Sequence, residues 1–241
     1  MQVFAKSDIG RERQLNEDYY YASNESDRIK LFILADGMGG YNGGEIASKL
    51  SVESIQKYIY KNLDITIADD DYIIDLLTEA LKFANKVVYA EAKKSESLSG
   101  MGTTTDCCLI LKHKLYIAHI GDSRVYRIRK DYMRKLTKDH SYVQQLVDEG
   151  KISREEAIDH PKKNMLLKAL GCTKNIEPDV FVKNFQKDDI LIMCSDGLSN
   201  MIKEDEIKNI IKEDINVAAE GLVEKANDNG GLDNITVIIV K

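Results

Sequence analysis

The sequence predicts an α+β fold with antiparallel sheets, and three features of the chain support this prediction. Apolar, strand-like segments come in pairs joined by short turns, at Lys112-His113-Lys114 and at Lys130-Asp131. Two long helical segments stand together before these hairpins, and two shorter ones stand together near the end of the chain. Because doubly wound parallel sheets alternate strand and helix one by one, this grouping favours antiparallel pairing.

Four helices are expected where apolar residues recur every three or four positions. The two long ones span residues 46–59 and 73–88, with Asp71 as the expected N-cap of the second. The two shorter ones span residues 204–211 and 217–226. The helices therefore form two blocks, separated by a run of strands.

Strands are predicted where a short apolar run ends at a turn signal. They span residues 31–35, 106–111, 115–120, 125–129, 133–137, 189–194 and 235–240. Residues 138–169 interrupt the pattern because they are polar and contain His140 and His160. We expect this segment to form a helical flap inserted between strands.

Composition narrows the class of protein. The 241 residues contain no Pro/Gly/Ser-rich linker and no internal repeat, so we expect one domain over 1–241 that includes the flap. The net charge of -6 argues against nucleic-acid binding by phosphate neutralisation. No apolar run could cross a bilayer and no signal peptide is evident, so we expect no membrane association. The four cysteines form no C-x-x-C pair, and we expect a monomer in the cytoplasm.

Several aspartates stand where a predicted strand ends, usually beside glycine. Asp36-Gly37 follows residues 31–35, and Asp196-Gly197 follows residues 189–194. Two more such positions are Asp122 and Asp233. Asp without His or Cys fits Mg²⁺ or Mn²⁺ better than Zn²⁺. A single Asp-Gly is more often an ordinary turn, so the pattern by itself leaves a shared metal site and separate turns equally open.

The N-terminal segment, residues 7–18, mixes acidic residues with Arg11 and Arg13. Arginine is suited to bidentate binding of phosphate. A solvated loop with surface ion pairs is the alternative interpretation.

Six short motifs, taken in order, resemble those of the PPM (type 2C) metal-dependent serine/threonine protein phosphatases. They are Asp8-x-Gly10-x-x-Arg13-x-x-Asn16-Glu17-Asp18, Ala35-Asp36-Gly37-Met38-Gly39-Gly40, Gly102-Thr103-Thr104, Gly121-Asp122-Ser123-Arg124-x-Tyr126, Ser195-Asp196-Gly197-Leu198 and Asp233-Asn234-Ile235-Thr236. The flap, with Asp139-His140-Ser141 and His160-Pro161, resembles bacterial members in particular. The resemblance implies a four-layer α-β-β-α sandwich of two antiparallel sheets flanked by helices.

The resemblance also implies a site with two Mn²⁺ or Mg²⁺ ions. By similarity, Asp36 bridges the ions, Asp196 and Asp233 bind the first, and the Gly37 carbonyl binds the second. Asp18 is expected to hold metal-bound water. Asp122 is expected to bind a weaker third ion with Asp196. A hydroxide between the metals would attack phosphorus directly, without a phospho-enzyme, while Arg13 binds the phosphate oxygens.

Two positions depart from the family pattern. Met38 and Tyr41 stand where relatives often place a histidine that serves as general acid. No motif therefore assigns a histidine to protonate the leaving oxygen, and the acid stays unidentified. His140 and His160 are expected at the surface of the flap.

Three functions compete at this point. The first is a phosphoserine/phosphothreonine phosphatase acting on phosphorylated proteins, among them a bacterial serine/threonine kinase and its substrates. The second is a non-catalytic regulatory module with the same fold, against which the presence of Asp36, Asp196 and Asp233 argues. The third keeps the chemistry but acts on anti-sigma-factor antagonists, whose phosphatases usually carry extra sensor domains.

Overall fold

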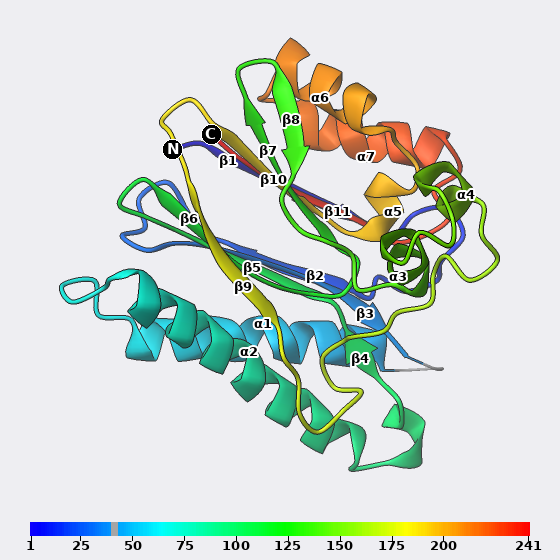
Figure 1. The fold of residues 1–241 in the computed structure, drawn as a ribbon, viewed down its shortest axis with the longest axis horizontal. Helices are drawn as coiled ribbons and strands as arrows, with labels where there is room; N and C mark the ends of the chain where they lie inside the picture. Colours follow the sequence, from blue (N-terminus) through cyan, green and yellow to red (C-terminus); the bar gives the residue numbers. More distant parts are fainter. Residues whose placement is uncertain (40–42) are drawn as a thin grey trace.

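The computed structural model describes residues 1–39 and 43–241. Gly40, which ends the second motif, and Tyr41, which departs from the family pattern, lie outside the described residues. Figure 1 shows two stacked sheets between two helical layers, which confirms the predicted α-β-β-α sandwich. None of the helices in the described part of the chain is both long and apolar enough to cross a membrane.

The two sheets are antiparallel throughout. The first has the order β1-β11-β10-β7-β8, and the second has the order β2-β3-β5-β6-β9, with β4 paired to β3. The strands of the first sheet are β1 (Val3–Asp8), β7 (Arg124–Arg129), β8 (Tyr132–Lys135), β10 (Ile190–Cys194) and β11 (Ile235–Val240). Those of the second are β2 (Asp18–Ala22), β3 (Lys30–Met38), β4 (Gly102–Thr103), β5 (Thr105–Leu111), β6 (Lys114–Ile120) and β9 (Asp179–Asn184).

Helices cover the outer face of each sheet. The long helices α1 (Gly44–Asn62) and α2 (Asp70–Ala92) lie on the second sheet, and α6 (Glu204–Glu213) and α7 (Ala218–Asp228) lie on the first (Figure 1). Shorter pieces are η1 (Glu96–Leu98) and α5 (Asp196–Ser199). The flap contains α3 (Tyr142–Asp148) and α4 (Arg154–Ile158), so its helical character is confirmed.

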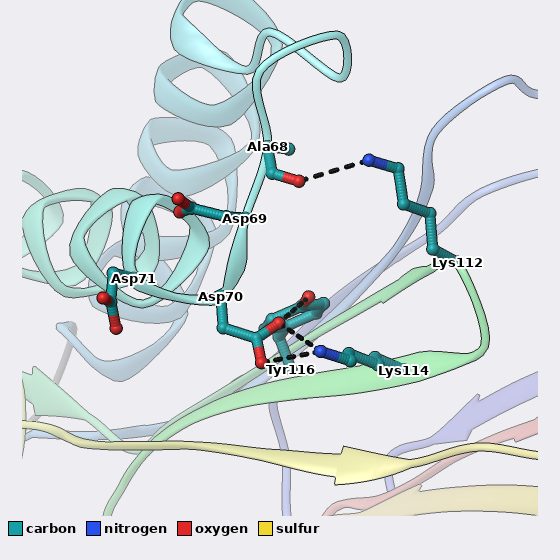
Figure 2. A pocket seen from close by; sticks show the side chains of 7 residues that line it. All are labelled: Ala68, Asp69, Asp70, Asp71, Lys112, Lys114 and Tyr116. Atoms are coloured by element: carbon teal, nitrogen blue, oxygen red, sulfur yellow. Dashed lines mark hydrogen bonds and ion pairs between the residues drawn. The ribbon is translucent and has the colours of Figure 1, made fainter.

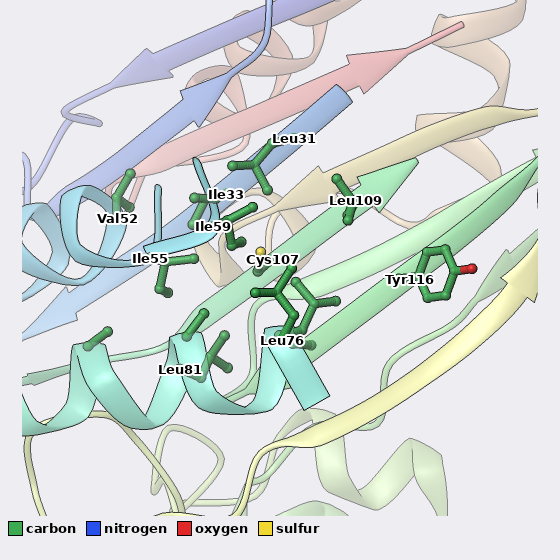
Figure 3. Close-up of a cluster of buried hydrophobic side chains, with 14 of the residues drawn as sticks. Leu31, Ile33, Val52, Ile55, Ile59, Leu76, Leu81, Cys107, Leu109 and Tyr116 are labelled. Atoms are coloured by element: carbon green, nitrogen blue, oxygen red, sulfur yellow. The ribbon is translucent and has the colours of Figure 1, made fainter. Parts of the chain in front are cut away.

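Each interface between layers has its own apolar cluster. Figure 3 shows the cluster between α1, α2 and the second sheet, to which Leu31, Ile33, Ile55 and Leu81 belong. Alternate residues of the same strands, such as Phe32, pack in a different cluster between the two sheets. This alternation follows from the two-residue repeat of a strand and determines which side chains face the opposite sheet.

Edge strands account for most of what the sequence did not predict. β1, β2 and β9 lie outside the predicted strands, and each forms an edge of its sheet. Edge strands carry polar residues and lack a continuous apolar run, so they give a weak signal. The expected N-cap Asp71 was wrong. Helix α2 begins two residues earlier because the side chain of Asp69 accepts the backbone N–H of Tyr72.

Candidate active site

Asp36 faces the layer between the sheets. In β3 the side chains of Phe32 and Leu34 pack in the inter-sheet cluster, and Asp36 continues this alternate row at the end of the strand. Its backbone is fixed by β4 and β5, because Thr104 Oγ1 accepts from Asp36 N at 3.1 Å and Thr103 Oγ1 donates to the Asp36 carbonyl at 2.9 Å. The carboxylate is half-buried at the mouth of the inter-sheet layer.

Asp18 lies directly opposite Asp36 in the β2–β3 register and is buried. The two sheets meet at this residue. Ser195, which follows β10 of the other sheet, donates its hydroxyl to Asp18 Oδ2 at 2.7 Å and accepts the backbone N–H of Thr236 at 2.9 Å. One serine side chain therefore links β2 of the second sheet to β10 and β11 of the first.

Asp196 and Asp233 come from the first sheet. Asp196 begins α5 directly after β10, and Asp233 lies just before β11. Arg13 donates to Asp233 Oδ2 at 2.8 Å, and this ion pair is partly exposed at the rim. The N-terminal segment is held there by Asn234, whose side chain accepts from Glu17 N and donates to the carbonyls of Ile9 and Leu15.

Two glycines allow the motifs to approach each other closely. A Cβ atom on Gly37 would lie 2.1 Å from the Gly44 carbonyl oxygen, and one on Gly197 would lie 2.0 Å from that of Asn234. Neither distance is possible for a real side chain. Glycine beside Asp36 and Asp196 is thus required by packing, in addition to any role of the Gly37 carbonyl.

The five aspartates Asp18, Asp36, Asp122, Asp196 and Asp233 form what we call the strand-end cluster. Burial, reinforced by the charges of the other members, raises the pKa of Asp36 well above its usual range. Burial raises the pKa of Asp18 to about 7, although hydrogen bonds from Thr236 and Ser195 act in the opposite direction. Burial and the charge of Asp233 also raise the pKa of Asp196. Grouped carboxylates that repel one another in this way favour a bound cation.

A divalent cation fits this donor set. Asp18 Oδ1 is buried without a hydrogen-bond partner, and the surrounding groups offer carboxylate and carbonyl oxygens. The carboxylates are gathered but are not drawn around one point. Among residues 1–39 and 43–241, no three His, Cys, Asp or Glu side chains already form a group that could hold a metal ion. The aspartates nevertheless lie close enough for their charges to raise one another's pKa.

Asp122 occupies a separate turn of the same region. It is half-buried, and burial together with the charge of Asp196 raises its pKa to about 7. The turn is tied to the Asp36 strand, because Ser123 Oγ lies 2.7 Å from Thr104 Oγ1. Met38 lies beyond Asp36 in β3 and pairs with Gly102 in β4.

The surface position expected for His140 was wrong. Its side chain is only 10% exposed, since the ring packs on His119 with centroids 4.7 Å apart. His119 is fully buried and its Nδ1 lies 2.7 Å from Asp106 Oδ1 across the β5–β6 hairpin. The contact of His140 with His119, and that of His119 with Asp106, were not predicted from the sequence. Counting outward from the turn at Lys112 would have placed Asp106 opposite His119.

A different acidic stretch shows what an ordinary cluster of aspartates looks like. Asp69, Asp70 and Asp71, here called the helix-start cluster, line a hollow of approximately 510 Å³ beside Lys112, Lys114 and Tyr116 (Figure 2). Asp69 caps α2, and Asp70 accepts from Lys114 at 2.6 Å and from Tyr116 at 2.7 Å. Two of these three carboxylates, those of Asp69 and Asp70, therefore already have partners within the protein.

Comparison with known proteins points to one family. The family model described as Protein phosphatase 2C matches residues 9–225. Serine/threonine phosphatase stp of Listeria innocua is 39% identical over 238 residues, which cover 98% of this chain and 94% of the relative. The crystal structure of the Mycobacterium tuberculosis serine/threonine phosphatase PstP/Ppp matches with a TM-score of 0.89 at 35% identity, over 99% of this chain and 97% of that one.

A second solved structure holds metal. It is the catalytic domain of serine threonine protein phosphatase PstP in complex with two manganese ions, with a TM-score of 0.87 at 33% identity over 99% of this chain and 96% of that one. The fold, the gathered carboxylates and these matches define the enzyme class as protein-serine/threonine phosphatase. The chain belongs to the protein phosphatase 2C family, of the bacterial type, as its motifs predict.

Proposed function

We propose that this protein is a metal-dependent phosphatase for phosphoserine and phosphothreonine in proteins, with residues 1–241 acting as one domain. The observation that carries the proposal is the strand-end cluster: carboxylates from both sheets meet at one mouth, with the guanidinium of Arg13 at its rim. A doubly charged phosphate group is otherwise repelled by aspartates. A site of this kind therefore needs cations to bind its substrate.

Asp36, Asp196, Asp233 and the Gly37 carbonyl would hold two Mn²⁺ or Mg²⁺ ions, and Asp18 would support them from beneath. Asp122 would hold a weaker third ion together with Asp196. The manganese ions of the related PstP structure support the choice of metal. When bound, such a pair of cations supplies a nucleophile from water at neutral pH and offsets phosphate charge, so no covalent phospho-enzyme is needed.

The residues of the chain have separate tasks in this proposal. Arg13 binds and orients the phosphate oxygens, because its guanidinium fork matches their geometry and its position is exposed. Ser195 orients Asp18 through their 2.7 Å hydrogen bond. Met38 cannot donate a proton, so we propose that Asp122 supports protonation of the leaving oxygen.

Phosphorylated proteins are the proposed partners, among them a serine/threonine kinase and its substrates, and we propose that the protein acts as a monomer.

The deciding experiment measures release of phosphate from a phosphothreonine peptide with and without Mn²⁺, for the wild type and for Asp36→Ala. We expect metal-dependent turnover in the wild type only. Absence of metal-dependent turnover in both proteins would instead favour the non-catalytic regulatory module.

A further inference from the structure

His140 and Gly121 exchange two hydrogen bonds. The backbone N–H of His140 donates to the Gly121 carbonyl at 2.7 Å, and the backbone N–H of Gly121 donates to the ring Nδ1 of His140 at 3.2 Å. Gly121 immediately precedes Asp122. The start of the flap, residues 138–140, is therefore hydrogen-bonded to the turn that carries Asp122.

The hydrogen positions on the His140 ring follow from its neighbours. A backbone N–H can only donate, so Nδ1 must accept and carries no hydrogen. The other nitrogen, Nε2, lies 3.3 Å from Asp179 Oδ2 and holds the ring hydrogen. Burial and the nearby His119 lower the pKa of His140, which is consistent with this neutral form.

The ring is held from behind. It stacks at 34° on His119, which lies between Asp106 and the Lys138 carbonyl at 2.7 and 3.0 Å. Lys138 is the first residue of the flap. His119 is fully buried in the inter-sheet layer, so it provides a rigid surface for the ring of His140.

On its other side the turn is limited by Thr104. Gly121 has φ +115°, and a Cβ atom on it would lie 2.4 Å from Thr104 Cβ. The turn is therefore confined between Thr104, which binds the Asp36 backbone, and His140. A substitution that removes the His140 Nδ1 acceptor would leave the Gly121 N–H without its hydrogen-bond partner in the flap.

We propose that His140 is a positioning residue, which holds the Gly121–Asp122 turn and through it sets the direction of the Asp122 carboxylate toward the other aspartates of the strand-end cluster. The positioning itself is independent of catalysis. Its effect on turnover rests on the function proposed above.

The first test uses His140→Asn and His140→Gln. Asparagine Oδ1 is as many bonds from the backbone as His Nδ1, so His140→Asn can still accept from Gly121. The glutamine amide reaches the Nε2 position instead, so His140→Gln removes that acceptor. Amide hydrogen exchange at Gly121 is measured by NMR in the metal-free protein, relative to Cys108 in the core. We expect exchange about five-fold faster in His140→Gln, the change expected for one hydrogen bond, and unchanged in His140→Asn.

The matched control is His160→Gln, the other flap histidine, which should leave Gly121 exchange unchanged. Equal protection in wild type and His140→Gln would overturn the proposal, as would equal loss in the Asn and Gln variants.

The second test measures turnover of a phosphoserine peptide. His140→Gln should lower kcat with KM kept, and His140→Asn should restore kcat. If the wild type hydrolyses no phosphopeptide, the proposed function fails, while the exchange data still decide the role of His140. If the wild type is active and His140→Asn is as slow as His140→Gln, the positioning role fails.

Discussion

The strand-end cluster and the helix-start cluster contain the same residue type, yet their environments have opposite effects on the carboxylates. Asp70 is partly exposed, and hydrogen bonds from Lys114 and Tyr116 lower its pKa (Figure 2). Asp36 shares its site with other carboxylates, and burial with their charges raises its pKa. In the helix-start cluster a lysine compensates the charge of Asp70. In the strand-end cluster the neighbouring carboxylates add to the negative charge around Asp36.

The difference shows what turns a group of acids into a site. Three consecutive aspartates at a helix start are far more conspicuous in the sequence than single aspartates spread over residues 18–233. Uncompensated charge at an accessible mouth, and not local acidity, identifies the candidate site. The following changes test this distinction, beginning with the largest expected effect.

Asp36→Ala should abolish turnover of phosphothreonine peptides. If Asp36 holds both ions as proposed, its loss removes cation stabilisation of several kcal/mol, so the rate should fall by at least about 10³-fold. Steady-state kinetics at saturating Mn²⁺ measures this, and circular dichroism checks that the fold is kept. A wild-type rate in this variant would rule out the strand-end cluster as the active site.

Asp122→Ala should distinguish leaving groups. A serine alkoxide needs a proton to leave, whereas p-nitrophenolate does not, so hydrolysis of phosphoserine peptides should slow by roughly 10²- to 10⁴-fold. Hydrolysis of p-nitrophenyl phosphate should change much less. Equal slowing on both substrates would show that Asp122 supports the main metal pair or the fold.

Arg13→Ala should act on substrate binding. A hydrogen bond to a charged group contributes about 1.5–3 kcal/mol, so KM should rise roughly ten- to a hundred-fold while Mn²⁺ affinity is kept. Arg11→Ala, which changes an exposed arginine two residues away, is the matched control. An unchanged KM in Arg13→Ala would place the phosphate elsewhere.

The pH dependence of stability should differ between metal-free and metal-loaded protein. The pKa values of Asp18 and Asp122 are raised to about 7 in the fold, so each binds a proton more readily when folded. This proton binding adds to the free energy of unfolding. The added stability is fully present below about pH 4 and is lost as the pH rises through about 7. Metal-free protein should melt roughly 5 °C lower at pH 8 than at pH 5.

Mn²⁺ should remove this decline, because a bound cation favours the ionised carboxylates. Asp18→Asn, which cannot titrate at this position, should make the metal-free profile shallower, while Asp122 still titrates. A metal-free melting temperature that rises between pH 5 and pH 8 would contradict the raised pKa values.

Asp70→Ala should have the smallest effect. Its carboxylate is partly exposed and already paired with Lys114, and exposed ion pairs contribute little to stability. We expect unchanged kinetics and a melting temperature close to that of the wild type. A loss of turnover comparable to Asp36→Ala would remove the distinction between the two clusters.

The sequence predicted the interior of the fold better than its margins. The central strand β10 is a continuous apolar run and β3 contains one over residues 31–35, and both were predicted. The predicted end of β3 at residue 35 was wrong, because the strand continues through Asp36 to Met38, where it pairs with β4. The edge strands β1, β2 and β9 were not, because one side of each has no strand partner and tolerates polar residues. The start of α2 was placed two residues late because Asp69, Asp70 and Asp71 are equally good caps by residue type.

The candidate site divides in the same way. Asp36 and Asp196 could be selected because a buried strand leads into each and glycine follows. The pairing of Arg13 with Asp233, across 220 positions of sequence, depends on β1 lying beside β11 and has no local signal. His140 is buried because its ring packs on His119 and accepts from Gly121, which are distant in sequence. The polar flap sequence gives no sign of these contacts and predicts an exposed side chain.

The hydroxyl of Ser195 marks a junction between the sheets, and this has a mechanical consequence. Asp18 and Asp36 belong to one sheet, while Asp196 and Asp233 belong to strands or strand ends of the other. Any ion held by both pairs is a cross-link between the two halves of the sandwich, placed at one end of their shared apolar layer. Without such an ion, that end is joined by hydrogen bonds from a few side chains, among them Ser195, Asn234 and Ser123. The two sheets should then separate more readily at this end than at the other. The metal-bound protein should therefore unfold more cooperatively than the metal-free protein.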